Sequence, residues 1–367
     1  MKILFYLGHP AHYHLFKNII QDLKNSNHKI DILIKKKDIL EDLLITSNFH
    51  YLNILPEGRN DSKLGIIWGL IKRDFAILRR CVKYRPDLMI GTSTEITHIG
   101  KLVNIPSIIV NEDDYNAVPL FSKLGYPFAT NILAPISCKT GKSNSKWESK
   151  TIHYKGFHEL SYLHPKNFIA DINLIGEQIS LSKPFYIIRF AKLTAHHDKG
   201  KTGITTSLAE KIIEILSNKG NVYITAERKL ESQFEKYRIS IPANKIHHAL
   251  AFADIYIGDS QTMAAEAAVL GTPSIRFNDF VGKLGYLEEL ETYGLTKGIK
   301  TSEPDKLFNT IEKDINNPKL KEEFMEKRKK MLLDKIDVAS FFVWFIQNFP
   351  KSVKIMKENP DYQDKFK

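Results

Sequence analysis

Short apolar segments alternate with helical patterns along this chain, in two successive series. The first series of expected strands covers residues 2–7, 29–34, 51–55, 87–91, 107–111 and 131–134. The second covers residues 185–190, 221–225, 255–258 and 273–277. Helices, including residues 14–26 and 63–84, are expected between the strands. Because strands joined through helices pair in parallel, the pattern predicts an α/β protein with two doubly wound, Rossmann-like sheets.

Length and local composition indicate where the two sheets separate. The chain has 367 residues, which suits two domains of ordinary size. A polar stretch at residues 140–150 follows the first series of strands, so the boundary is expected near residue 160. The predicted domains are residues 1–160 and 161–337, followed by an apolar helix and tail at residues 338–367.

Charge and cysteine content restrict the setting and the partners. The formal net charge of +11 favours anionic partners, and no nucleic-acid module is visible. Cys81 and Cys138 lack metal-ligand spacing and indicate a reducing compartment. The sequence shows no signal peptide and no apolar run long enough to span a bilayer, so a cytoplasmic protein is expected. Acidic membrane surfaces and phosphorylated substrates rank above nucleic acid as partners.

Residues 253–273 are the strongest candidate for a ligand site. They read as a buried strand, a tight turn, a helix start and a Gly-x-Pro exit. A turn at a helix N-terminus presents free N–H groups to an anion, and Glu266 can hold vicinal hydroxyls from the same helix. An ordinary strand–turn–helix capped by Ser260 is the alternative. The residues expected at the ligand are Gly258, Asp259, Ser260, Gln261, Thr262 and Glu266.

This segment resembles the donor-site motif of GT-B enzymes, which include nucleotide-sugar glycosyltransferases and non-hydrolysing UDP-GlcNAc 2-epimerases. The epimerase motif runs Asp-Ser-Gly-Gly-x-x-Glu-Glu-Ala, and Asp259-Ser260 and Glu266-Ala267 match it with the same spacing. Gln261-Thr262 replace the glycines and Ala265 replaces the first glutamate. The looser glycosyltransferase pattern is matched cleanly by Glu266 alone. The whole chain also resembles an uncharacterised family assigned to the GT-B superfamily.

The resemblance implies two Rossmann-like domains facing across a cleft, with a helix at residues 338–349 that crosses back to the first domain. A helix packed only on its own domain is the alternative. The second domain would bind a nucleotide-sugar, UDP-linked, as a substrate, and no separate cofactor is expected. The first domain would bind an acceptor hydroxyl, and lipid-linked acceptors are common among GT-B glycosyltransferases.

Histidines at positions 9, 12 and 14 follow the first strand. Ligands bind at the carboxyl edge of such sheets, and a histidine there can act as a general base. Inverting GT-B transferases have a histidine shortly after a glycine in the first loop; by this resemblance His12 is the first candidate base and His14 the second. Capping or surface histidines are the alternative. A metal site on two of them is a weaker option, and no metal is expected.

Glu95 and Glu112 end two further strand-to-loop transitions of the first domain. Residues 91–95 loosely resemble a Gly-Asp-Thr segment of the epimerases, and Glu112 falls where those enzymes place a catalytic carboxylate. Both glutamates are candidates for orienting the acceptor or for removing its proton. Helix capping by Ser93 or Asp113 is the alternative.

Basic residues follow the first strand of the second domain. In GT-B enzymes this loop contributes to the pyrophosphate site, so Arg189, Lys192 and His196 could offset the diphosphate charge and stabilise the departing nucleotide. Thr225 ends the next strand and is expected beside the nucleotide. A solvated basic loop is the alternative.

Residues 63–84 combine an apolar stripe at helical spacing with a basic face. An amphipathic basic helix that contains a tryptophan can lie on an anionic membrane. A helix packed on the core through its apolar stripe, with the basic face solvated, is the alternative.

Together these features predict a metal-independent glycosyltransferase that moves a sugar from a nucleotide-sugar to an acceptor hydroxyl, in surface polysaccharide or glycolipid assembly. It would be cytoplasmic, or peripheral to the inner face of the cell membrane through residues 63–84. A nucleotide-sugar epimerase and a non-catalytic nucleotide-binding module are the alternatives.

Overall fold

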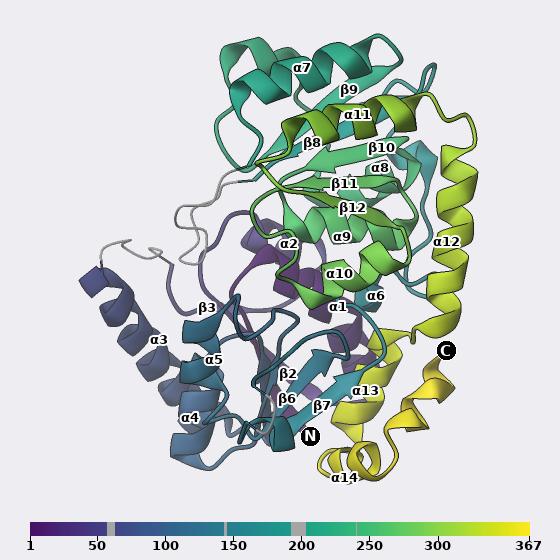
Figure 1. Cartoon of the computed structure of the whole chain (residues 1–367). Helices are drawn as coiled ribbons and strands as arrows, with labels where there is room; N and C mark the ends of the chain where they lie inside the picture. The colour runs from purple at the N-terminus through teal and green to yellow at the C-terminus, as the bar shows by residue number, and fades with distance from the viewer. Residues whose placement is uncertain (57–62, 143–144, 192–202, 240) are drawn as a thin grey trace. The chain divides into compact units, whose positions relative to one another are not determined.

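The computed structural model describes residues 1–56, 63–142, 145–191, 203–239 and 241–367. It divides the chain into two compact units, which can be followed by colour in Figure 1. Unit 1 comprises Met1–Tyr162 and Ile336–Lys367, and unit 2 comprises Leu163–Lys335.

Unit 1 contains a parallel sheet with the strand order β3-β2-β1-β4-β5-β6-β7. Its strands are β1 (Lys2–Leu7), β2 (Lys29–Ile34), β3 (Leu52–Asn53), β4 (Leu88–Gly91), β5 (Ser107–Val110), β6 (Asn131–Pro135) and β7 (Thr151–Tyr154). The central strand β1 has the sequence KILFYL and is buried from its second residue onward. A continuous apolar run is what a parallel strand covered on both faces requires.

The helices of unit 1 alternate with these strands and return at the C-terminus. They are α1 (Pro10–Asn25), α2 (Leu40–Thr46), α3 (Lys63–Tyr84), α4 (Glu95–Val103), α5 (Pro119–Gly125), α13 (Val338–Gln347) and α14 (Lys351–Glu358), with α6 (Leu160–Leu163) at the unit boundary. The predicted start of the first helix, residue 14, is wrong. Helix α1 begins at Pro10, because proline is favoured there and His9 Nδ1 accepts the Ala11 N–H at 3.2 Å.

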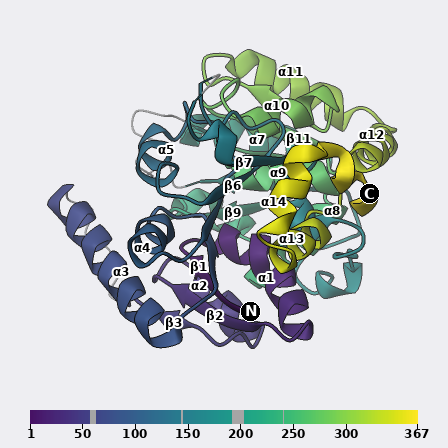
Figure 2. The ribbon, with the colours of Figure 1, turned by 90° about the horizontal axis from the view of Figure 1, so that it is seen from below.

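The C-terminal segment packs on unit 1, which confirms the crossing helix. Helix α13 contacts α1, beside which it lies in Figure 2. The Phe342 ring lies 5.1 Å from the Tyr154 ring of β7. Lys155, directly after β7, donates its N–H to Gln363 Oε1 at 2.7 Å and its ammonium to Asp364.

Unit 2 contains a second parallel sheet, with the order β12-β11-β10-β8-β9. Its strands are β8 (Phe185–Phe190), β9 (Asn221–Ala226), β10 (Ile255–Gly258), β11 (Ser274–Phe277) and β12 (Thr296–Ile299). Its helices are α7 (Thr206–Ser217), α8 (Ile246–Phe252), α9 (Gln261–Leu270), α10 (Gly285–Thr292), α11 (Pro304–Ile315) and α12 (Leu320–Asp334). Both sheets are doubly wound, as the alternation of elements predicts.

Two strands lie outside the predicted series, and one prediction is too long. The edge strand β7 follows the polar stretch 140–150, so that stretch belongs within unit 1. The edge strand β12 reads TKGI, in which lysine and glycine weaken the strand pattern. The expected strand at residues 51–55 is reduced to the two residues of β3, because only Leu52 and Asn53 pair with β2.

Candidate functional site

Each sheet has a point at which strand order reverses, and ligands of such folds bind beyond the carboxyl ends of the strands there. In unit 1 the reversal lies between β1 and β4, and in unit 2 between β8 and β10. The loops at these two carboxyl ends form two candidate regions, which we call the unit 1 edge and the unit 2 edge.

His12 lies on the first turn of α1 at the unit 1 edge. The Gly8 N–H donates to His12 Nδ1 at 3.0 Å, and the Thr92 hydroxyl oxygen lies 2.7 Å from both ring nitrogens. Because a backbone N–H can only donate, Nδ1 carries the lone pair and this contact assigns the ring hydrogen to Nε2.

The surroundings of His12 keep its imidazole neutral. Burial, with electrostatic contributions from His9, Lys35 and His158, holds the pKa of His12 well below its usual value. The neutral ring carries its N–H at Nε2, beside the Thr92 hydroxyl. To accept a proton from a substrate, Nδ1 must first release the N–H of Gly8.

His158 and Glu112 bring two further loops to the unit 1 edge. His158 follows β7 and Glu112 follows β5, and His158 Nδ1 lies 3.2 Å from Glu112 Oε2. Burial lowers the pKa of His158 to about 4, against the opposing effects of Glu159 and Asp113. At neutral pH the pair is therefore a neutral imidazole beside an acidic side chain.

At the unit 1 edge, the absence of a side chain at Gly8 leaves room for Lys35. A methyl group at position 8 would lie 3.3 Å from Lys35 Cε and 3.5 Å from Ser93 Oγ. Lys35 follows β2 and Ser93 follows β4, so the loops after these two strands meet the loop after β1 around Gly8 and His12. The edge combines an ammonium group, hydroxyls, neutral imidazoles and a carboxyl group, which together can orient a polar substrate and accept its proton.

Two predicted catalytic side chains have other surroundings. His14 lies two positions after His12, so it leaves α1 on a different side, and its ring lies 5.4 Å from that of Tyr162. Glu95 begins α4, and its Oε1 accepts from Arg73 Nε of α3 at 2.5 Å. Both members of this ion pair are buried, so Glu95 joins two helices of unit 1.

In unit 2, Asp259 binds backbone N–H groups before and after residues 192–202. Its carboxylate accepts the Ala191 N–H at 2.6 Å and the Ile204 N–H at 3.2 Å. Burial raises the pKa of Asp259 to about 6, against the effect of these backbone hydrogen bonds. The predicted residues Lys192 and His196 lie in that segment, outside the described residues.

Ser260 caps the helix that starts at the unit 2 edge. Its hydroxyl accepts the Met263 N–H at 3.4 Å, and Gln261 and Thr262 form the first turn of α9. The helix is alanine-rich and buried along residues 263–270, and it ends at Gly271 in the left-handed conformation. The N–H groups of its first turn point out of the helix toward the carboxyl end of β10.

Gly258 separates two arginines on one face of the sheet of unit 2. In the strand register, Gly258 of β10 lies opposite Arg189 of β8 and Arg276 of β11. A side chain at position 258 would overlap the Tyr256 hydroxyl and Arg189 Cβ, so this position requires glycine. Paired residues of neighbouring strands point to the same side, which brings both guanidinium groups to the face that α9 covers.

The two guanidinium groups are partly paired. Arg189 donates to Thr225 Oγ1 at 2.7 Å and to Glu227 Oε1 at 2.5 Å. Arg276 is fully buried and donates through Nη2 to Glu291 Oε1 at 2.8 Å. Among the described residues, Nε of both arginines and Nη1 of Arg276 have no hydrogen-bond partner. Buried donors of this kind favour an anion nearby.

Glu266 turns toward the helix that precedes β10. His247 Nε2 of α8 lies 2.9 Å from Glu266 Oε1, and both side chains are buried. The orientation of this carboxyl group is therefore set by His247.

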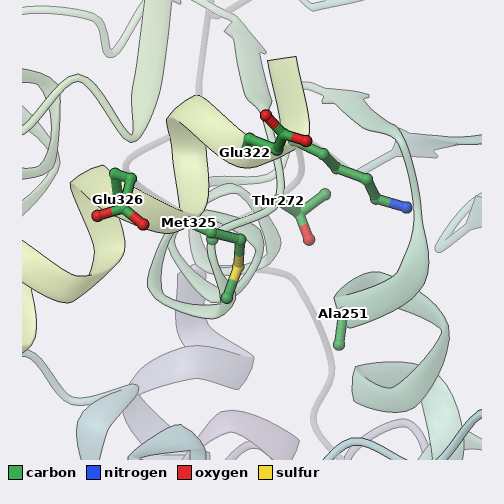
Figure 3. Close-up of a pocket in the computed structure, with 7 residues that line it drawn as sticks. Ala251, Thr272, Glu322, Met325 and Glu326 are labelled. Atoms are coloured by element: carbon green, nitrogen blue, oxygen red, sulfur yellow. The ribbon is translucent and has the colours of Figure 1, made fainter. Parts of the chain in front are cut away.

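A pocket of about 310 Å³ in unit 2 (Figure 3) is lined by none of the predicted site residues. It is lined by Ala251, Gly271, Thr272, Lys321, Glu322, Met325 and Glu326. Because Gly271 ends α9, the pocket lies at the opposite end of that helix from Ser260. Its two glutamates disfavour a diphosphate, so the loop geometry is the better guide to the nucleotide site.

Four residues at the two edges are absent from the sequence prediction: Lys35, Thr92, His158 and Arg276. Lys35 directly follows an expected strand, and this position is the sequence signal that would have marked it as a candidate site residue. His158 follows β7, which the sequence does not mark as a strand. Arg276 reads as an ordinary strand residue until the register places it beside Gly258.

Two searches across the described parts of the chain are negative. Those parts contain no group of three or more histidine, cysteine or acidic side chains arranged to hold a metal ion. None of their helices is both long and apolar enough to cross a bilayer.

Solved structures of nucleotide-sugar enzymes share this architecture. A putative UDP-N-acetylglucosamine 2-epimerase from Listeria monocytogenes matches with TM-score 0.67 and 14% identity over 98% of this chain and 97% of that one. UDP-GlcNAc 2-epimerase from Neisseria meningitidis, bound to UDP-GlcNAc, gives 0.59 and 13% over 90% and 100%. Spinosyn rhamnosyltransferase complexed with spinosyn aglycone gives 0.61 and 14% over 95% and 100%. These likenesses establish the GT-B fold.

No curated protein sequence matches the chain. Residues 1–337 match the model of a family described as protein of unknown function (DUF354). The match covers most of the 367 residues, and the chain therefore belongs to the DUF354 family.

Proposed function

We propose that this protein is a metal-independent glycosyltransferase that moves a sugar from a nucleotide-sugar to an acceptor hydroxyl. The observation that carries the proposal is the placement of Arg189 and Arg276 on either side of Gly258, at the start of α9. A diphosphate at the unit 2 edge would meet N–H groups of a helix N-terminus and those guanidinium N–H groups of Arg189 and Arg276 that have no partner among the described residues.

The donor half of the reaction is assigned to the unit 2 edge. The first turn of α9, with Ser260, Gln261 and Thr262, would hold the diphosphate, and Glu266 would hold the ribose hydroxyls. As the bond between the anomeric carbon and the phosphate oxygen breaks, negative charge grows on the nucleotide. Arg189 and Arg276 would stabilise that charge without a metal ion. UDP is the favoured nucleotide, because the epimerase of N. meningitidis binds UDP-GlcNAc.

The acceptor half is assigned to the unit 1 edge. The acceptor oxygen forms the new bond to the anomeric carbon and gives its proton to a base. His12 can take this proton at Nδ1 only after losing the Gly8 N–H, whereas Glu112, as a carboxylate, can accept a proton beside the neutral imidazole of His158. This arrangement supports Glu112 as the base, and His12 together with the Thr92 hydroxyl beside its Nε2 as the groups that orient the acceptor. A lipid-linked acceptor in surface polysaccharide or glycolipid assembly is consistent with the positive net charge of the chain, which favours anionic partners such as a membrane surface.

A nucleotide-sugar epimerase is the second candidate, favoured by the spacing of Asp259-Ser260 and Glu266-Ala267 and by the fold of the epimerases. Saturation-transfer NMR with UDP-, GDP-, CMP- and dTDP-sugars separates the candidates. Binding of one intact nucleotide-sugar, lost in Arg276→Met, and turnover only with added acceptor supports the transferase. A new sugar isomer without acceptor indicates the epimerase, and binding without turnover over any acceptor indicates a binding module. Absence of binding would overturn all three.

A further inference from the structure

Helix α3 lies along the outside of unit 1, next to α4 in both views (Figures 1 and 2). Large apolar side chains of its described part face solvent: Trp68, Ile71, Phe75 and Val82 are 59%, 51%, 66% and 66% exposed. Their spacing places them on one stripe of the helix. An apolar stripe normally faces the core. In α3 the stripe faces solvent, so the helix is rotated about its own axis away from the usual orientation.

Contacts on the other side of α3 fix this rotation. Arg73, Ile77 and Cys81 recur every four residues and are buried. Arg73 is bonded to Glu95, and Arg80 donates to both oxygens of Asp31 at 2.6 and 2.7 Å. The outward apolar stripe is therefore built into the packing of unit 1. The sequence-based alternative, a core-packed apolar stripe, is wrong for Trp68, Ile71, Phe75 and Val82, whereas Leu78 packs against the core.

His98 of α4 connects α3 to the region of α5, where further apolar side chains are exposed. His98 Nδ1 lies 3.4 Å from Asp74 Oδ2 of α3, and His98 Nε2 donates to the Leu124 carbonyl at 2.9 Å. The Phe128 ring lies 5.3 Å from the His98 ring. Leu124 and Phe128 are both exposed, so large apolar side chains outside α3 also face solvent in this part of unit 1.

Exposed cations border the apolar stripe of α3. Lys72, Arg79 and Lys83 are exposed on one side of the stripe, and Lys72 Nζ lies 6.0 Å from the centre of the Trp68 ring. Asp74 is the single acidic residue of α3, and it faces His98. Two copies of this surface meeting about a two-fold axis would bring like charges together. Anionic lipid headgroups complement the cations, and tryptophan is favoured at the membrane interface.

We propose that α3 docks the protein on the surface of an anionic lipid bilayer. Trp68, Ile71 and Phe75 enter the boundary between headgroups and acyl chains, and Lys72 and Arg79 contact lipid phosphates. This docking goes beyond the proposed reaction and does not depend on it.

Sedimentation of the full chain with lipid vesicles tests the proposal. The protein should bind vesicles of phosphatidylcholine with phosphatidylglycerol more tightly than vesicles of phosphatidylcholine alone, and added salt should weaken binding. Phe75→Glu should reduce vesicle affinity by about tenfold or more. Leu333→Glu in α12 is the matched control, because Leu333 is 75% exposed, and it should bind as wild type. Melting curves show that each variant is folded.

Three results would overturn the docking proposal. The first is wild-type protein that does not bind the anionic vesicles, and the second is equal loss of binding in both variants. The third is a wild-type dimer that Phe75→Glu converts to monomers without any vesicle binding, since a second copy would then cover α3. Because no nucleotide-sugar is present, each outcome is independent of the success or failure of the proposed transferase.

Discussion

His247 Nε2 lies 2.9 Å from Glu266 Oε1, and both side chains are almost completely buried. The contact joins α8, which precedes β10, to α9, which follows it. A carboxyl group held in this way has a fixed orientation relative to the first turn of α9. The proposed contact between Glu266 and ribose hydroxyls therefore depends on His247.

Substitution at either residue of this pair should separate binding from stability. Glu266→Gln keeps an oxygen for His247, so it should melt near wild type while weakening nucleotide-sugar binding about tenfold. His247→Ala leaves a buried carboxyl group without this partner and should lower the free energy of unfolding by about 1–3 kcal/mol. Saturation-transfer NMR and urea unfolding measure the two effects. Wild-type affinity in Glu266→Gln would make Glu266 a structural residue.

The bounds of β1, α3 and β8 are those predicted from sequence, for a local reason. The buried parallel strands are nearly continuous apolar runs, interrupted in β8 by Arg189, and α3 has an uninterrupted helical period. The start of α1 is less predictable, because its cap is a histidine rather than a residue that commonly caps helices. The rotation of α3 about its axis depends on two ion pairs, Arg73 with Glu95 and Arg80 with Asp31. The partners in each pair lie far apart in the chain, so a local sequence pattern does not reveal them.

The same contrast applies to the candidate site, where a sequence motif reveals some residues and only the structure reveals others. Asp259 and Ser260 belong to one short segment, so a motif can reveal them. Arg276 becomes notable only through its register with Gly258, and His158 only through its distance to Glu112. Both relationships join parts of the chain that no single-sequence pattern connects.

Gly258→Ala should destabilise the protein. The added methyl group would overlap the Tyr256 hydroxyl and Arg189 Cβ inside a packed sheet, at a cost of about 1–3 kcal/mol. Gly176→Ala is the matched control, because the nearest atom to an added methyl group is the Ile172 carbonyl oxygen at 3.9 Å. Urea unfolding should show a lower midpoint for the first variant alone. Equal midpoints would mean that Arg189 and Tyr256 can move away from Gly258.

His158 should make the protein less stable in mild acid. Its folded pKa of about 4 lies below the unfolded value of about 6.5, so between these values the unfolded chain binds the extra proton. The free energy of unfolding should therefore fall as pH drops from about 6.5 to 4, by roughly 3 kcal/mol in full.

His158→Gln should remove this contribution, so that the free energy of unfolding falls less between pH 7 and pH 5 than in the wild type. His50→Gln, at an exposed position, serves as the control and should keep the wild-type slope. Urea unfolding at the two pH values measures the difference. An unchanged slope in His158→Gln would show that the pKa of His158 in the folded protein is not lowered.

The ion pair of Arg73 and Glu95 should act on stability rather than on turnover. Removing one partner, as in Glu95→Leu, leaves a buried guanidinium unpaired and should cost about 3–5 kcal/mol. Arg73→Met combined with Glu95→Leu removes both charges, so much of the lost stability should return. Turnover of a nucleotide-sugar with a soluble acceptor should then approach the wild-type rate. A double variant that is stable but inactive would instead place Glu95 at the acceptor, as the sequence predicts.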